Sequence, residues 1–94
     1  MFDATLSGEN EVLLTGRFDA TQVAKAKLVF DLLTRSTRVN FKELEYISSA
    51  GLGLLIATQK RLGEGGQALK LCQLTGHVKD IFYYAGFDKI FEIE

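Results

Sequence analysis

Two adjacent serines, Ser48 and Ser49, are the residues whose type and spacing most clearly suggest chemistry. They end an apolar run and precede Ala50 and Gly51, after which leucines follow with helical spacing. This order predicts a strand that leads into a helix through a serine cap, which accepts a hydrogen bond from an unpaired N–H group of the first turn. The same position favours a phosphoryl group, because the amide donors and the helix dipole both attract negative charge. The serines therefore predict either a structural cap or a phosphorylation switch.

The remaining polar residues do not form a catalytic or metal-binding set. The single histidine, His77, lies at the start of a predicted helix, where a solvated first-turn residue is the simpler interpretation. The single cysteine, Cys72, lies in an apolar strand and is predicted to be a small core residue. One cysteine and one histidine cannot supply a four-ligand zinc site. The glycines at 63–66 follow a helix and precede a strand, which indicates a helix stop rather than a phosphate loop.

Size and charge restrict the class of protein further. The chain has 94 residues, so we expect one domain over residues 1–94. Its 11 basic and 12 acidic residues give a net charge of −1, which does not favour a nucleic-acid partner. A lone cysteine fits a reducing cytoplasm, and no apolar run approaches the roughly 20 residues that span a bilayer. We therefore expect a cytoplasmic protein without membrane insertion, metal or cofactor.

Apolar periodicity and turn residues predict the elements that position the serines. In the helix after the serines, Leu52, Leu55, Ile56 and Leu62 are predicted to face the core, which leaves Leu54 facing outward. The order β-β-α-β-α-β-α-β predicts an α/β layer fold with a mostly parallel sheet. The helices either leave one face of the sheet free or are divided unevenly between its two faces. The predicted strands are 2–6, 11–17, 37–41, 68–74 and 90–93, and residues 43–47 lead into the serine turn. The first predicted helix runs from 19 or 21 to 33, the second from the serines to 62, and the third from 75 or 76 to 85.

The serine turn and its flanking segments resemble the anti-sigma factor antagonist family, also called STAS domains. The similarity covers nearly the whole chain and rests on the order and spacing of several motifs. It implies a single STAS-like α/β domain with a mixed, mostly parallel sheet of four to five strands and with helices mainly on one side. The motifs are the helix entry at 16–20, the strand at 39–44, the serine turn at 46–53, the glycines at 65–66 and the ending at 85–87 with its apolar final strand.

The resemblance implies a regulatory interaction protein of the bacterial cytoplasm rather than an enzyme. Family members dock onto an anti-sigma factor, usually a serine kinase, and docking frees the sigma factor for transcription. The kinase phosphorylates a hydroxyl at the start of the second helix, and a phosphatase removes the phosphate. Phosphate adds about −1.5 to −2 charges, so it would act by repulsion or steric conflict in the docked surface.

The turn departs from the usual family pattern, Asp-Ser-Ser/Thr-Gly. Aligned on Gly51, the usual acceptor position is occupied by Ala50, which cannot be phosphorylated. Ser49 is then the first candidate phosphosite and Ser48 the second, with a purely structural cap as the alternative. An acidic residue often found in the preceding strand aligns with Asn40, whereas Asp19 is kept.

The resemblance places a docking surface around the start of the second helix. Leu54 is of interest because it lies off the predicted core stripe, although a neighbouring loop would equally well bury it in part. The predicted partner-binding residues are Asp19, Ala20, Thr21, Ser48, Ser49, Ala50, Gly51, Leu52, Leu54, Thr58 and Arg61.

Two other functions remain open. A small STAS subunit of an ABC-type lipid transporter would bind its ATPase subunit permanently and without phosphorylation, and Ala50 favours this alternative. A small enzyme or nucleotide binder is the third alternative, against which the missing catalytic groups argue.

Overall fold

The computed structural model describes residues 1–8 and 10–94 of the chain. Strands and α-helices follow one another in the predicted order, β-β-α-β-α-β-α-β. None of the described helices is long and apolar enough to cross a membrane. The elements are β1 (Asp3–Leu6), β2 (Glu11–Phe18), the 3-10 helix η1 (Ala20–Gln22), α1 (Val23–Phe30), β3 (Thr37–Ile47), α2 (Ser49–Glu64), β4 (Leu69–Cys72), α3 (Gly76–Tyr84), the 3-10 helix η2 (Phe87–Lys89) and β5 (Glu92–Ile93).

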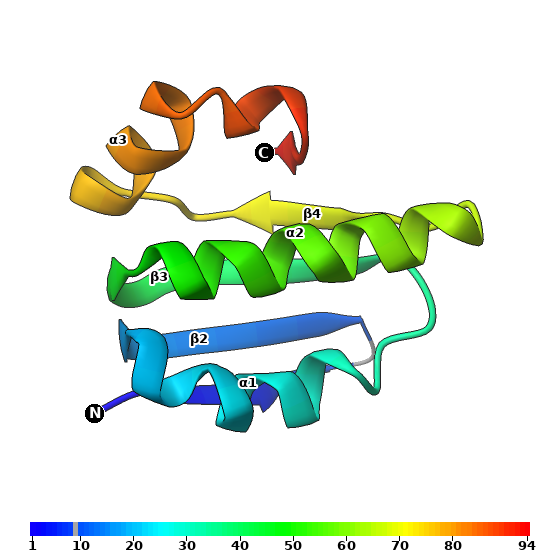
Figure 1. Cartoon of the computed structure of the whole chain (residues 1–94), viewed down its shortest axis with the longest axis horizontal. Coiled ribbons are helices and arrows are strands. Elements are labelled where there is room, and N and C mark those ends of the chain that lie inside the picture. The colour runs from blue at the N-terminus through cyan, green and yellow to red at the C-terminus, as the bar shows by residue number, and fades with distance from the viewer. Residues whose placement is uncertain (9) are drawn as a thin grey trace.

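The strands form one five-stranded sheet in the order β1-β2-β3-β4-β5 (Figure 1). β1 pairs with β2 antiparallel, and every later pair is parallel. This confirms the predicted mixed, mostly parallel sheet. The strand order itself did not follow from the sequence. The hairpin turn predicted at 7–10 includes Glu9, which lies outside the described residues.

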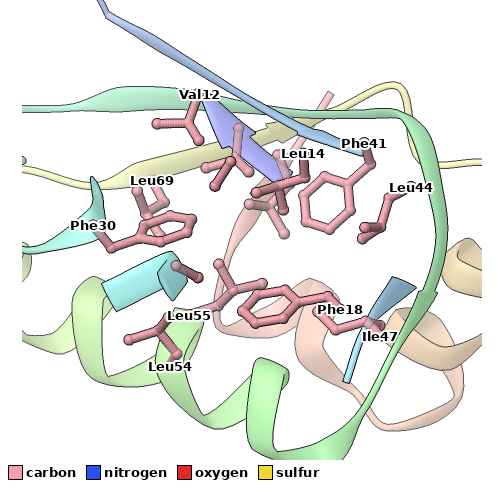
Figure 2. Packing of buried hydrophobic residues seen from close by; sticks show 14 of the residues in the cluster. Val12, Leu14, Phe18, Phe30, Phe41, Leu44, Ile47, Leu54, Leu55 and Leu69 are labelled. Carbon is pink, nitrogen blue, oxygen red and sulfur yellow. The ribbon is translucent and has the colours of Figure 1, made fainter. Parts of the chain in front are cut away.

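The helices lie on one side of the sheet, as the resemblance implied. Figure 1 shows α1 and α2 in front of the strands, with α3 beyond β4. Alternate strand residues such as Val12, Leu14 and Phe41 face the helices and form one core with Leu55 of α2 and Phe82 of α3 (Figure 2). The opposite face of the sheet is mixed. One row across it is charged and pairs Glu11 with Arg38 and Arg38 with Lys70, whereas the next row contains Leu13, Asn40 and Cys72.

Aromatic contacts fix α3 and the C-terminal segment to the sheet. The Phe82 ring packs edge-on against Phe41 of β3 at a centroid distance of 5.5 Å. It also contacts Phe87 and Phe91, each at 6.0 Å. Such pairs each contribute about 0.5–1.5 kcal/mol beyond area burial, so Phe82 joins α3 to β3 and to the C-terminal segment.

The largest differences from the predicted element boundaries occur in α1, β3, β4 and β5. α1 ends at Phe30 rather than near residue 33, and β3 continues unbroken through residues 37–47. β3 stays continuous because register shifts in its pairing with β2 absorb the irregularity in its pattern. β4 covers only Leu69–Cys72 of the predicted 68–74, and β5 shortens to two residues because η2 occupies the segment before it. The predicted helix stop at 63–66 is confirmed by Gly66, whose φ is +78°.

Gly16 is required where β2 passes the N-terminal segment. Its φ is +81°, and a Cβ there would lie 1.5 Å from the carbonyl oxygen of Met1. Only glycine combines this backbone conformation with such a close approach. The bulge after Gly16 carries β2 on to Phe18, whose buried ring lies beneath the start of α2.

Candidate functional site

The predicted site lies where β2 and β3 end and α2 begins. The backbone N–H of Ser48 donates to the carbonyl oxygen of Phe18 at 2.8 Å. This bond places the segment that begins with Asp19 beside the serine turn, although 29 positions separate the two in the sequence. A Cβ on Gly51 would lie 3.0 Å from Ile47 and 3.2 Å from Phe18, so the small residue lets α2 start close to the strand ends.

Ser48 is the N-cap of α2, as predicted. Its backbone is extended, with φ −86° and ψ 169°, and its hydroxyl oxygen accepts from the N–H of Gly51 at 3.2 Å. Its carbonyl oxygen accepts the first intrahelical bond, from Leu52 at 2.9 Å. The Ser48 side chain is half-buried and already occupied by a structural role.

Ser49 is the first residue of α2 and is exposed. Within residues 1–8 and 10–94, its hydroxyl makes no hydrogen bond. The first turn of α2 also contains no acidic residue. A phosphate on Ser49 would therefore meet the positive end of the helix dipole without a neighbouring carboxylate in that turn. The two serines differ in their roles, because one hydroxyl caps the helix and the other faces solvent.

Asp19 orders the neighbouring segment. Its carboxylate accepts hydrogen bonds from the backbone N–H of Thr21, at 3.0 Å, and from the Thr21 hydroxyl. Asp19 is the N-cap of η1, which confirms it as the cap at this position. Ala20 and Thr21 are exposed, so this short turn presents an edge to solvent next to the start of α2.

The prediction that Leu54 faces outward is wrong. Leu54 is 8% exposed and belongs to the core, and Thr58 is 4% exposed, with its hydroxyl donating to the Leu54 carbonyl at 2.8 Å. α1 lies beside α2, so α2 is covered on its α1 side as well as beneath. The buried side of α2 is consequently rotated from the predicted one, and Leu52 and Ile56 are only partly buried.

Arg61 has a structural partner within the chain. Its guanidinium donates to the carbonyl oxygens of Leu33 and Phe30, each at 2.9 Å. Phe30 is the last residue of α1, where a cation is favourable, and Leu33 lies in the segment that follows the helix. Arg61 was predicted to bind a partner protein, whereas the structure gives its side chain a capping role on α1.

The exposed side of α2 is formed by small uncharged residues over its first three turns. Ser49, Ala50, Gly53 and Ala57 are exposed, and the first charged side chain is Lys60. The prediction missed Gly53 and Ala57, although the spacing of small residues from 49 to 57 was a usable signal. Hereafter the α2 ridge means Ser49, Ala50, Gly53 and Ala57 together with the partly exposed Leu52 and Ile56.

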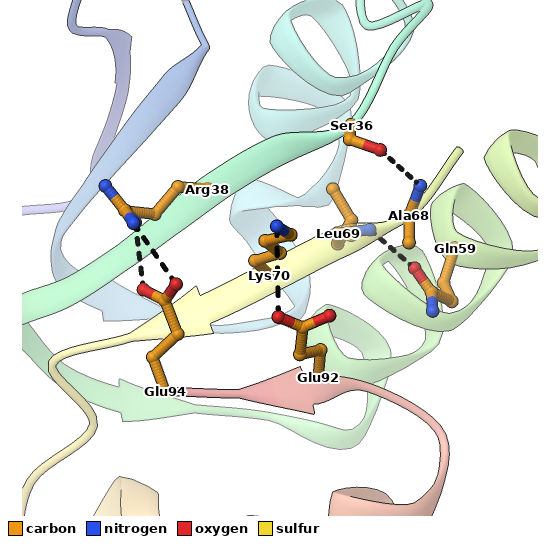
Figure 3. A network of polar contacts seen from close by, with 8 residues as sticks. All are labelled: Ser36, Arg38, Gln59, Ala68, Leu69, Lys70, Glu92 and Glu94. Atoms are coloured by element: carbon orange, nitrogen blue, oxygen red, sulfur yellow. Dashed lines mark hydrogen bonds and ion pairs between the residues drawn. The ribbon is translucent and has the colours of Figure 1, made fainter.

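Side-chain hydrogen bonds tie α2 to β4 and to the C-terminal segment, and tie the α1–β3 loop to the residue before β4. The Gln59 side-chain oxygen accepts from the N–H of Leu69 at 2.7 Å, and Ser36 accepts from Ala68 at 3.0 Å (Figure 3). The Gln59 amide nitrogen donates to the Ile90 carbonyl at 3.1 Å. The helix that carries the α2 ridge is therefore tied to its neighbours by polar contacts in its C-terminal half.

Titratable groups with shifted pKa values lie away from the site, on the helix-free face of the sheet. Arg38 binds Glu94 through two hydrogen bonds of 2.9 and 3.1 Å, which lower the pKa of the carboxyl and raise that of the guanidinium (Figure 3). Cys72 is buried, as predicted, but on this helix-free face beside Asn40. Its burial raises the pKa of the thiol above the usual value.

His77 is exposed in the first turn of α3, as predicted. In the part of the chain that the structure describes, no group of three His, Cys, Asp or Glu side chains could hold a metal ion.

A family model described as "Mlab, STAS domain" matches residues 3–92. The chain belongs to the STAS-domain family. This agrees with the fold and with the position of the serine turn at the start of α2.

Individual relatives of this STAS domain include anti-sigma factor antagonists. BtrV of Bordetella bronchiseptica, provisionally named as one, is 37% identical over 59 residues, which are 63% of this chain and 51% of BtrV. The match thus spans about half the length of that relative.

Two solved structures share the fold over nearly the whole chain. An anti-sigma factor antagonist from Mycobacterium paratuberculosis is 16% identical with a TM-score of 0.82, covering 99% of this chain and 83% of its own. The phosphorylated form of the Bacillus cell fate determinant SpoIIAA is 17% identical with a TM-score of 0.70, covering 100% of this chain and 91% of its own.

Proposed function

We propose that this STAS domain is a non-enzymatic partner-switching regulator that binds an anti-sigma factor with serine-kinase activity. Phosphorylation of Ser49 ends this binding, and a phosphatase restores it. The observation that carries the proposal is the exposed Ser49 hydroxyl at the first position of α2, next to Ser48, whose hydroxyl is committed to the cap. SpoIIAA, a protein with the same fold, has a structure in a phosphorylated form, which supports a phosphate-controlled site.

The proposed docking surface combines the α2 ridge with the turn at residues 19–21. The ridge is free of charge for three turns, and its small residues allow a partner backbone to approach closely. Leu52 and Ile56 supply the apolar contact that was first assigned to Leu54. A phosphate on Ser49 would place about −1.5 to −2 charges in this neutral surface. Burying that charge against a partner is unfavourable, whereas the helix N-terminus keeps the phosphorylated domain folded.

The experiment is incubation of the purified chain with its cognate serine kinase and ATP, followed by intact mass and site mapping. We expect one phosphate on Ser49, none on the Ser49→Ala variant, and unchanged phosphorylation of a Thr5→Ala control. Calorimetry should show that Ser49→Asp weakens kinase binding by at least about tenfold while Ser49→Ala binds normally. A phosphate on Ser48, or equal affinities of Ser49→Asp and the wild type, would contradict the proposal.

The second candidate function is a STAS subunit held permanently by the ATPase of an ABC-type transporter. Ala50 favours it, because the usual acceptor position has no hydroxyl and a permanent complex needs none. The α2 ridge would again be the contact surface. Affinity purification from the native organism distinguishes the candidates, since one predicts a serine kinase in the eluate and the other a transporter ATPase. Both predict a cytoplasmic location.

A further inference from the structure

The two edge strands of the sheet differ in length. β5 contains two residues, whereas β1 contains four and pairs only with β2 (Figure 1). An edge strand presents backbone N–H and C=O groups that can pair with a strand of another chain. β1 is therefore the edge at which the sheet could be extended, and the state of its outward backbone groups decides whether a further strand can be added.

The pairing of β1 with β2 fixes which backbone groups of β1 point away from the sheet. The N–H of Ser7 donates to the carbonyl oxygen of Glu11 at 2.7 Å, so these two opposite residues form a hydrogen-bonded pair. Hydrogen-bonded pairs alternate along an antiparallel ladder, and in this register the series continues at Thr5 and Asp3. The residues whose backbone groups point outward are therefore Phe2, Ala4 and Leu6.

Two of these outward groups are already bound by side chains of the same chain. The N–H of Ala4 donates to Oδ1 of Asp3 at 2.9 Å. The carbonyl oxygen of Phe2 accepts a hydrogen bond of 3.0 Å from Nζ of Lys25, which belongs to α1. The same Nζ lies 3.6 Å from Oδ1 of Asp3. Asp3 and Lys25, hereafter the β1 guard, thus form one connected set of contacts along the edge.

Pairing of β1 with the β1 of a second copy would break these contacts. In an antiparallel pair centred on Ala4, the N–H of each Ala4 would donate to the carbonyl oxygen of the other. The carbonyl oxygen of Phe2 would accept from the N–H of Leu6 in the second copy. Both bonds use a backbone group that the β1 guard occupies. Moving the second strand by two residues in either direction still requires the Ala4 N–H, because Ala4 is the central outward residue of β1.

We propose that the β1 guard is a built-in block that prevents a second copy of this chain from adding its β1 to the sheet. Charged side chains, lysine above all, protect sheet edges in many proteins. In this chain the block acts on defined atoms, because the carboxylate and the ammonium group bind the backbone groups that an added strand would need. β1 is separated from β3 and the serine turn by β2, so the proposal does not depend on the role of Ser49.

Sedimentation velocity of the full chain from about 10 µM to 1 mM tests the proposal. The double variant Asp3→Ala/Lys25→Ala should self-associate at least about tenfold more strongly than the wild type. The matched control is Lys27→Ala/Asp31→Ala, which also removes one ion pair between a lysine and an aspartate but leaves the guard intact. The control should sediment like the wild type. A guard variant that associates no more than the wild type, or a control that associates equally, would overturn the proposal.

Amide hydrogen exchange measured by NMR locates the contact in the associated guard variant. The amides of Ala4 and Leu6 should exchange more slowly as the concentration rises, because they would donate to the second copy. The amide of Thr5, which faces β2, is the internal reference. The single variants Asp3→Ala and Lys25→Ala should each show part of the effect, which keeps the test available if the double variant folds poorly. Association without added protection at Ala4 would refute strand addition at β1.

Discussion

Arg61 of α2 donates a hydrogen bond of 2.9 Å to the carbonyl oxygen of Phe30, the last residue of α1. A second bond to Leu33 makes the guanidinium a cap for the α1 C-terminus. Through this contact the far end of α2 is tied to α1. The side-by-side arrangement of the two helices is the same one that leaves Leu54 buried and the α2 ridge exposed.

Arg61→Ala should lower the free energy of unfolding by about 1–2 kcal/mol, because two charge-assisted hydrogen bonds are lost at a partly solvated site. Arg61→Lys should recover part of this loss through its charge, but not the paired geometry. Lys60→Ala is the matched control and should stay within about 0.5 kcal/mol of the wild type. Urea denaturation measures all three, and equal losses for Arg61→Ala and Lys60→Ala would show that the cap adds no stability.

Ser48→Ala and Ser49→Ala should separate stability from signalling. The first removes the cap bond to Gly51 and should cost about 1 kcal/mol, which for a domain of this size lowers the Tm by roughly 4–8 °C. The second removes an exposed hydroxyl and should leave the Tm unchanged within about 2 °C. Differential scanning calorimetry is the measurement, and a larger loss for Ser49→Ala than for Ser48→Ala would reverse the assigned roles.

Gly53→Ala should stabilise the domain and weaken docking at the same time. Nothing lies within 4 Å of a Cβ at Gly53, so the exchange gains about 0.5–1 kcal/mol of helix propensity. The added methyl group would stand on the α2 ridge and reduce affinity for the kinase. Combined urea denaturation and calorimetry test this, and an unchanged affinity would exclude Gly53 from the contact.

Gly16→Ala should destabilise the domain, in contrast to Gly53→Ala. An alanine at φ +81° that also meets the Met1 carbonyl should lose about 2 kcal/mol or more. Denaturation in urea should show a lower midpoint with the slope maintained. A midpoint equal to that of the wild type would mean that the N-terminal segment moves aside without cost.

Acid should weaken the Arg38–Glu94 contact. The hydrogen bond from Arg38 lowers the pKa of Glu94 in the folded state, so the stabilisation is present above the unfolded-state pKa, near 4.3. It is lost as the pH falls through the folded-state pKa. Glu94→Gln should therefore reduce the slope of stability against pH below about pH 4.5, whereas Glu92→Gln should have a smaller effect. Identical acid limbs for Glu94→Gln and the wild type would show that the pair does not stabilise the fold.

Local patterns in the sequence were sufficient to predict the elements and the serine cap. The Ser48 cap depends on residues within one helical turn, and the stops at Gly66 and Gly86 depend on single backbone conformations. Hairpin pairing of β1 with β2 and the alternation of strands with helices also act over short distances along the chain. Helix ends such as that of α1 were less certain, because tertiary contacts decide them.

The exposed side of α2 could not be predicted in the same way. Periodicity gave a core stripe through Leu52 and Ile56, but α2 is covered both by the sheet and by α1, which rotates the buried side to include Leu54 and Thr58. Arg61 was equally ambiguous, because its carbonyl partner at Phe30 is 31 positions away. Local sequence patterns do not indicate a contact with a residue so distant in the chain.

By itself the sequence determined the order of elements and a hydroxyl pair at the start of a helix, because caps, turns and apolar periodicity act between residues close together in the chain. The one-sided arrangement of the helices was implied only by the family resemblance. Only the tertiary structure decided which hydroxyl is occupied by the backbone and which is exposed, and which α2 residues meet solvent. Those outcomes depend on how α1, α2 and the strand ends pack against one another, and this packing is a property of segments far apart in the sequence.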